Sequence, residues 1–515
     1  MKAIAAAAAL LLAALPAVAQ RGAGPGGTSR VPGYAGWPRV PRGPLPIGEI
    51  APERRFTGAP FRGTIPLPPP ERQWIRLDTP HFRIISSAGE RRTRAIAEDF
   101  EKLTALLTRT SPFFRIAPVP TQVFIFGEHR DAQPYFDAVR GVRVEASGIT
   151  FRHSVGSTML LDAGIRGGDA ITPRHELVHD LLRSGERPLP LWIEEGLAEY
   201  YSNAGMPIRE HASRMYGGLR MPFAELFALS FDSPRSMSFD FYAQSWATVT
   251  TLMRRDPRAF FAFLRDIEAG TSVIAALRDH YRMSPRELEV AIRTAGAPAP
   301  SLLFHGMPMF VAPARMRRAE VLTELGSFLG RVKGREYDAE RHFRAALAEE
   351  PHNSAVYAAY ADALVIRPEC VREARVMADR ALDFQAGEAR AHAAMALSYL
   401  AERDHESARP YLERAYAGHP ERIDVAFPLF ALCMESGERE KAESIFLALA
   451  DTPKVTEARK LLLRADIPRA DALAREGKLI EAARVLRELA PKMPGKTRAN
   501  LETQAASLEA AARRE

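Results

Sequence analysis

The chain of 515 residues has only two cysteines, Cys370 and Cys433. A scaffold held together by disulfides needs many more cysteines than this, so that class of protein is excluded at this length. The two could form a single pair in an oxidising compartment. Because both lie in a part of the chain with helical patterning, buried free thiols are the favoured interpretation.

Long hydrophobic runs are missing after the first residues. No later segment approaches the roughly 18 consecutive apolar residues of a transmembrane helix, so stable membrane insertion is not expected. Residues 1–19 begin with the charged start Met1-Lys2, continue with an apolar run and end in a small-x-small motif. This pattern is typical of a signal peptide and predicts a periplasmic or secreted protein cut near Ala19–Gln20. The alternative is an uncleaved N-terminal membrane anchor.

Blocks of basic residues are missing as well. The net charge of +7 and the pI of about 9.4 come mainly from scattered arginines. A nucleic-acid site would need clustered lysine or arginine with interleaved aromatics, so nucleic-acid binding is not expected.

One short motif carries recognisable chemistry. His175, Glu176 and His179 form an H-E-x-x-H sequence. On a helix, residues four apart share a face, so both imidazoles can bind one metal ion. The glutamate between them points to the side, where it can hold a water rather than the metal. Glu195 follows sixteen residues after His179 as a candidate third ligand, and Glu199 lies one helical turn further on.

These residues resemble the gluzincins, the clan of thermolysin and the aminopeptidases, and most closely their bacterial peptidase MA-like members. The resemblance covers residues 73–296. It implies one Zn²⁺ per chain, bound by His175, His179 and Glu195. It also implies that Glu199 hydrogen-bonds a ligand histidine. The alternative for Glu199 is a solvated position on its helix.

The same resemblance assigns two catalytic residues. Glu176 becomes the general base, and Tyr242, in a Tyr-x-x-Ser stretch, becomes the donor that stabilises the oxyanion. A core aromatic is the alternative for Tyr242. Asp180 could orient a histidine, although an acid on the helix surface is the favoured interpretation. Gly196 costs about 1 kcal/mol inside a helix, which predicts that another backbone approaches closely there.

The chain departs from the aminopeptidases in one respect. Their Gly-x-Met-Glu-Asn sequence supplies a glutamate for the free amine of the substrate, but the corresponding residues 156–162 contain none. Endopeptidase activity is therefore favoured. Exopeptidase activity is the alternative if another acid, such as Asp162, binds the amine.

Composition divides the rest of the chain. Residues 20–72 are rich in Gly, Pro and Arg and are predicted to be a linker. Residues 73–135 alternate like strands around a helical stripe, which indicates a small α/β subdomain. Residues 136–296 begin with two strands and continue with helices, and they form the predicted metallopeptidase domain. Residues 297–317 contain repeated Ala-Pro and look like a second linker.

Residues 318–515 repeat themselves. Ala339, Ala374, Ala408 and Ala442 are spaced 35, 34 and 34 residues apart. A period of about 34 with paired helices is the tetratricopeptide (TPR) signature. Such repeats stack into a solenoid that usually binds protein partners. An unrelated alanine-rich helical bundle is the alternative.

The sequence therefore predicts an α+β fold: a thermolysin/aminopeptidase-like zinc-protease domain with a small α/β N-terminal unit, followed by an all-α TPR-like solenoid. The predicted function is zinc-dependent hydrolysis of peptide bonds in the bacterial envelope, with a peptide or protein substrate and a protein partner for the repeats. The rival is an inactive or zinc-stabilised scaffold whose repeats gather other proteins. The presence of Glu176 argues against the rival, because a scaffold has no need of a general base.

Overall fold

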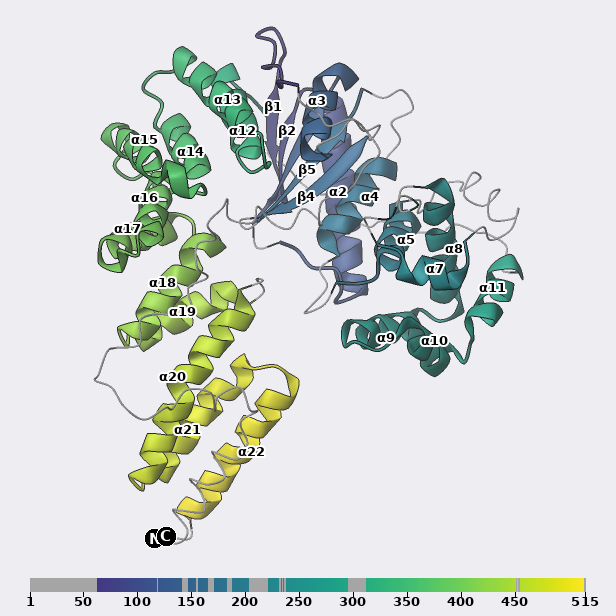
Figure 1. The fold of residues 1–515 in the computed structure, drawn as a ribbon, viewed down its shortest axis with the longest axis vertical. Helices are drawn as coiled ribbons and strands as arrows, with labels where there is room; N and C mark the ends of the chain where they lie inside the picture. Colours follow the sequence, from purple (N-terminus) through teal and green to yellow (C-terminus); the bar gives the residue numbers. More distant parts are fainter. Residues whose placement is uncertain are drawn as a thin grey trace. The chain divides into compact units, whose positions relative to one another are not determined.

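A computed structural model describes residues 63–117, 119–140, 147–153, 156–164, 171–182, 188–202, 221–230, 233, 235, 238–294, 312–450, 452 and 454–513. The predicted signal peptide 1–19, residues 20–62 of the first linker and residues 297–311 of the second lie outside the described residues. The described chain is a mixed α/β part followed by a mostly helical part (Figure 1). Within the described residues, no helix is long and apolar enough to cross a membrane.

A six-stranded sheet organises the first part, in the order β4-β5-β3-β2-β1-β6. β2, β3 and β5 run parallel, whereas β1, β4 and β6 run antiparallel to the strands they pair with. The strands are β1 (Ile75–Asp78), β2 (Phe82–Ser86), β3 (Thr121–Phe126), β4 (Gly148–His153), β5 (Gly156–Asp162) and β6 (Ala314–Arg315). One sheet thus unites strands that the sequence assigned to two successive units, 73–135 and 136–296.

Helices cover both faces of this sheet (Figure 1). α2 (Glu90–Thr110) and α4 (Ile171–Leu181) cover the first face, where Val123, Ile125, Met159 and Leu161 share a buried cluster with both helices. α3 (His129–Arg140) and α12 (Arg318–Leu329) cover the second face. There the Phe328 ring lies 5.8 Å from Phe124, and Tyr135 lies 5.1 Å from Phe126. Burial on both faces explains the unbroken apolar runs 123–126 in β3 and 159–161 in β5.

Between α4 and residue 294, the residues that the structure describes are mostly helical. Its helices are α5 (Leu191–Ser202), α7 (Phe223–Ala228), α8 (Phe239–Arg255), α9 (Pro257–Glu268), α10 (Val273–Tyr281) and α11 (Pro285–Thr294). Ser238, Asp256 and Ser272 cap α8, α9 and α10 with side-chain oxygens. Buried Trp192, Phe260 and Phe263 join these helices to the cluster on the first face of the sheet.

The C-terminal limit of the α/β part differs from the predicted domain boundary. β6 lies in the predicted second linker, 297–317, and pairs with β1. The compact unit that holds the sheet extends beyond residue 317 to Ile366 and also includes residues 376–386. It therefore contains α12, α13 (Glu336–Glu349) and α14 (Ser354–Leu364). A strand of two residues has no periodic pattern, and α12 begins directly in the segment 318–515 whose helical pattern the sequence assigned to the repeats.

The end of the first predicted linker is also tied down. Ile65 is fully buried, and its backbone N–H donates to Asp338 of α13 at 3.0 Å. Arg335 and Arg341 donate to the carbonyls of Gly63 and Ile65 at 2.9 and 3.2 Å. Residues 63–72 are consequently part of the folded unit, although their Gly- and Pro-rich composition is that of a linker.

The second compact unit comprises residues 367–375 and the described residues from 387 onward. Its described residues are almost entirely helical. Its elements are η2 (Pro368–Cys370), the start of α15 (Val371–Phe384), α16 (Ala389–Ala401), α17 (His405–Gly418), α18 (Ile423–Glu435), α19 (Arg439–Leu449), α20 (Val455–Arg475), α21 (Leu479–Leu489), η3 (Ala490–Lys492) and α22 (Gly495–Ala512). The repeated alanines Ala374, Ala408 and Ala442 are all fully buried, which lets neighbouring helices approach closely. Neither Cys370 nor Cys433 is part of a disulfide; Cys433 is buried as expected, whereas Cys370 is only partly buried.

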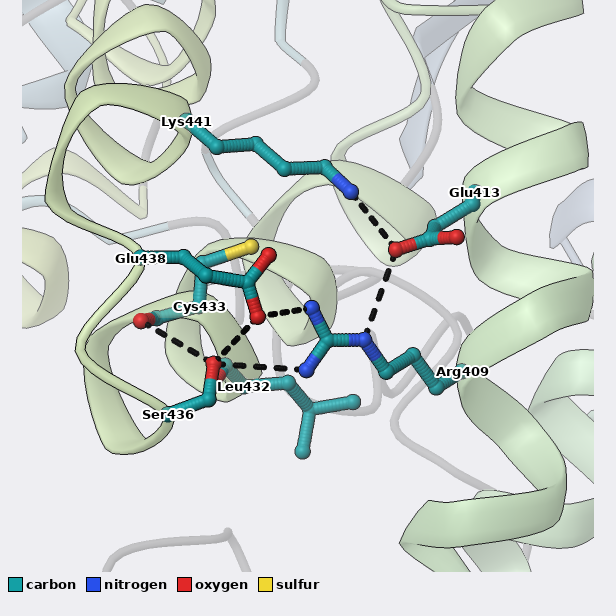
Figure 2. Close-up of polar contacts among 7 residues, drawn as sticks. All are labelled: Arg409, Glu413, Leu432, Cys433, Ser436, Glu438 and Lys441. Carbon is teal, nitrogen blue, oxygen red and sulfur yellow. Dashed lines mark hydrogen bonds and ion pairs between the residues drawn. The ribbon is translucent and has the colours of Figure 1, made fainter.

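Ion pairs connect successive repeats. Figure 2 shows Arg409 of α17 between Glu413 and Glu438, while Lys441 of α19 reaches back to Glu413 at 2.6 Å. The same type of link recurs before and after it: Arg375 bonds Glu402, and Arg439 bonds Asp466. We call this series of pairs the arginine ladder. In each case an arginine of one helix reaches an acid 27 to 29 residues later.

Candidate metal centre

The helix that carries the H-E-x-x-H sequence is held on two sides. Leu177, Val178 and Leu181 of α4 are buried against the first face of the sheet. The Arg174 guanidinium forms two bonds to Asp99 of α2, at 2.5 and 2.6 Å. Asp180 is buried and accepts from the Thr121 hydroxyl at 2.6 Å. The expected surface position of Asp180 is therefore wrong, and this acid fixes α4 to β3.

The structure brings the three predicted ligands together. The Nε2 atoms of His175 and His179 are 3.0 Å apart, and Glu195 Oε2 lies 3.2 and 3.3 Å from them. Among the described residues, this is the group of His, Cys, Asp or Glu that could hold a metal ion. Ligand atoms about 2.0–2.1 Å from a tetrahedral zinc are about 3.3–3.4 Å apart, so the spacing fits that ion.

The chemistry of the three atoms points the same way. His175 places its other ring nitrogen, Nδ1, 3.3 Å from Glu199 Oε1. If Nδ1 carries the proton that bonds Glu199, Nε2 is left as a lone pair directed at the centre of the group. Glu195 Oε2 is buried and accepts no hydrogen bond there. A cation would compensate these converging lone pairs, so the residues present fit a metal ion.

The ionisation of these groups reflects their crowding. Burial lowers the pKa of His175, but its contacts with Glu195 and Glu199 outweigh burial and hold that pKa well above its ordinary value. Burial raises the pKa of Glu195, but His179 and His175 outweigh it and hold that pKa far below its ordinary value. The cluster thus favours an ionised Glu195 carboxylate, which is the state that a metal ligand needs, whereas the proton that the raised pKa keeps on His175 would have to leave when a metal binds.

Glu176 leaves this group and turns toward β4. The Cγ atom of Glu176 packs directly against Gly148. A Cβ atom added to Gly148 would lie only 2.7 Å from that Cγ atom. The backbone carbonyl of Glu176 accepts from the Thr150 hydroxyl at 3.0 Å. The motif glutamate is therefore fixed between its own helix and the edge strand of the sheet.

Tyr242 of α8 lies beside the metal group. Its ring centroid is 6.3 Å from that of His175, with the rings edge to face. The residue is half-buried and also packs against the apolar core. Burial and then the charge of Glu195 raise the pKa of Tyr242 well above its ordinary value. The phenol therefore keeps its proton at neutral pH and can act as a hydrogen-bond donor.

Gly196 explains how α8 comes so close. A Cβ at this position would approach the Ser245 carbonyl oxygen of α8 to 2.6 Å. The prediction that another backbone approaches Gly196 is confirmed. This close crossing places Tyr242, three residues before Ser245, next to the residues of α4 and α5.

Two arginines near the site were not found from the sequence. Arg152 of β4 donates to the carbonyls of His179 and Leu182, at 2.9 Å for the latter, and so binds the C-terminal turn of α4. Burial lowers the pKa of the half-buried Arg140. The charge of Glu176 is the largest of the interactions that raise this pKa and so partly offset burial. Neither arginine has a motif or a periodic position that could have singled it out.

Asp162 does not join the site. Its carboxylate is 2.6 Å from Nδ1 of His129, and it accepts the backbone N–H of Gly164 at 2.7 Å. In the register of the sheet it is paired with Phe126, whose ring packs against Tyr135 on the second face. The metal group lies with α4 on the first face, so the sheet separates the two.

Comparison with known families identifies one part of the chain. A tetratricopeptide repeat model matches residues 399–467, which run from the end of α16 into α20. No curated protein matches the chain. Repeats of this kind typically mediate contacts between proteins.

Proposed function

We propose that this chain is a zinc-dependent peptidase that acts in the bacterial envelope. The observation that carries the proposal is the convergence of His175, His179 and Glu195 on one point, with Glu199 behind His175. Glu176, a residue type that can act as a general base, follows His175 in the sequence. Its side chain lies against Gly148 of β4 and does not join the three ligands. A purely structural metal site has four protein ligands, whereas three ligands are typical of a catalytic site.

The residues divide the work as follows. His175, His179 and Glu195 would hold the zinc, which when bound supplies a Lewis acid and lowers the pKa of a water. Glu199 holds His175 through Nδ1 and thereby fixes which ring nitrogen faces the centre. Glu176 takes the proton of the attacking water and passes it to the leaving amine. Tyr242 donates its hydroxyl proton in a hydrogen bond to the oxygen of the attacked carbonyl.

The surrounding fold supports the same proposal. The antiparallel strand β4 forms one edge of the sheet and lies along the motif helix α4. The resemblance to gluzincins places an extended substrate along a strand in this position. In our proposal the sheet, α4 and the helices from α5 to α11 together form a gluzincin-type catalytic domain, and the mature protein is periplasmic or secreted.

Internal cleavage of peptides is the favoured reaction. Asp162, the candidate anchor for a substrate amine, is already bonded to His129 and lies on the other face of the sheet. This leaves the exopeptidase alternative without its acid. The repeats provide the surface for a protein partner or for a folded substrate.

A scaffold without activity is the second candidate, and the tetratricopeptide match favours it. One experiment separates the two. Residues 20–515 are purified as wild type and as Glu176→Gln, and zinc content and cleavage of a peptide library are measured for both. We expect about one zinc per chain in each protein and only a small residual rate of cleavage from Glu176→Gln, because an amide cannot accept the proton. Zinc with no cleavage by the wild type would favour the scaffold, and stoichiometric zinc in His175→Ala would refute the ligand assignment.

A further inference from the structure

The edge strand β4 makes a row of contacts with the motif helix. Residues alternate between the two faces of a strand, so Gly148, Thr150 and Arg152 all face α4. Gly148 lies against the Glu176 side chain, and Thr150 and Arg152 bond the carbonyls of Glu176 and His179. The row therefore contacts the very residues for which the proposed function needs accurate placement.

Gly148 is the unusual member of the row. Glycine weakens a strand because it adds no packing and loses more entropy on folding than other residues. Its backbone here is not in the left-handed region that would require glycine, unlike that of Gly156 at φ 150°. The reason for glycine at position 148 is therefore space. A Cβ would lie 2.7 Å from Cγ of Glu176 and 2.7 Å from Cγ2 of Thr172, and no backbone atom is among its nearest neighbours.

Of these two neighbours, Glu176 has the more adjustable side chain. Thr172 is β-branched and stiff at χ1, and its hydroxyl bonds Ser147 at 3.0 Å. Glu176 has three side-chain torsions, while its backbone is held by Thr150. A methyl group at position 148 would accordingly rotate the Glu176 carboxylate, and a small shift of the first turn of α4, which holds Thr172 and none of the metal ligands, would relieve the second contact.

We propose that Gly148 is a positioning residue for the general base: the space above it, together with the Thr150 bond, sets where the Glu176 carboxylate sits. The inference rests on the proposed function, because Glu176 is a base only if the chain is a peptidase. The geometric part, that a methyl group at position 148 moves Glu176 and spares the metal ligands, can be tested separately.

The test compares Gly148→Ala, Glu176→Gln, the double variant and Gly387→Ala, all in residues 20–515. Gly387 is the control, since an added Cβ there meets nothing within 4 Å. We expect Gly148→Ala to keep about one zinc per chain and to lose roughly 100-fold in kcat with little change in KM, as for a catalytic group misplaced by about 1 Å. Gly387→Ala should match the wild type.

The double variant distinguishes positioning from damage to the fold. If Gly148→Ala acts through Glu176, adding it to Glu176→Gln should cost nothing further, because the two changes affect one group. A further loss in the double variant, or loss of zinc from Gly148→Ala, would overturn the inference. So would a kcat for Gly148→Ala within about two-fold of the wild type. Should Gly148→Ala fail to fold, Thr150→Val removes the bond to the Glu176 carbonyl; a loss in kcat with zinc retained supports the inference, and an unchanged kcat contradicts it.

A crystal structure of Gly148→Ala supplies a readout that is independent of activity. The inference requires the Glu176 carboxylate to move while His175, His179 and Glu195 stay in place. An unmoved carboxylate would refute it. A wild type that cleaves no peptide would refute the proposed function instead, and the position of Glu176 in the variant would still decide the geometric claim.

Discussion

The sharpest test of the architecture is a truncation at residue 310, where the sequence pattern places a domain boundary. Such a fragment retains every candidate ligand but loses β6 and α12. In the structure, Phe328 of α12 lies 5.8 Å from Phe124 and 6.3 Å from Phe151. Tyr135 also contacts it, at 6.5 Å. All three partners are buried and would become exposed on the second face.

The cost can be estimated from this burial. Fully burying one large apolar side chain contributes about 1.5–3 kcal/mol, which gives roughly 5–9 kcal/mol for the three aromatics. α3 still covers part of this face, so we halve the figure to roughly 2–4 kcal/mol. A domain is stable by about 5–15 kcal/mol in total. The fragment 20–310 should therefore be weakly folded, whereas 20–386, which keeps the whole compact unit, should be stable.

Urea unfolding followed by circular dichroism compares the two fragments, with zinc content as a second readout. The shorter fragment should unfold at a clearly lower urea concentration and bind less zinc, since a zinc site exists only in the folded chain. Equal midpoints would refute this reasoning. They would show that α12 covers the sheet without stabilising it, and that the boundary near residue 310 is real.

Three further changes address individual residues. Glu199→Gln should weaken zinc binding by roughly 10- to 100-fold, because His175 loses a charged partner, and competition with a chelator would measure it; an unchanged affinity would return Glu199 to a solvated position. Tyr242→Phe should lower kcat by roughly 100-fold or more with KM nearly constant, and steady-state kinetics that show no loss would make Tyr242 a core aromatic. Burial lowers the pKa of His342 to about 4. As the pH falls from about 6.5 to about 4, His342 therefore becomes protonated in the unfolded chain but stays neutral in the folded chain. Stability should drop by about 3 kcal/mol over that window, and a His342→Gln variant that shows the same drop in urea titrations would contradict this cause.

The sequence could predict the parts of the site that depend on one helix. His175 and His179 are one turn apart, so their imidazoles had to share a face, and Glu195 and Glu199 share a face for the same reason. Gly196 also carried information, since an expensive residue inside a helix indicates a close neighbour. The buried alanines of the repeats followed from their period of about 34 residues.

The rest depends on contacts between residues that are far apart in the sequence. β6 is too short for a pattern, and nothing in α12 marks it as a cover for the sheet rather than as a repeat. Residues 63–72 have the composition of a linker, but they are held in place by Asp338 and Arg341 of α13 and by Arg335 just before it. Gly148 is one of 34 glycines, and its role becomes visible only when α4 is placed against β4.

The arginine ladder has a consequence for how such an array can change in evolution. Each of its links, such as Arg375 with Glu402 or Arg439 with Asp466, joins nearest neighbours only. A duplicated or deleted repeat would therefore disturb one junction and leave the other links intact, since each repeat brings its own arginine and its own acid. Gain or loss of a whole repeat should therefore cost little stability. Related chains with more or fewer repeats should keep the same arginine-to-acid links between neighbouring helices.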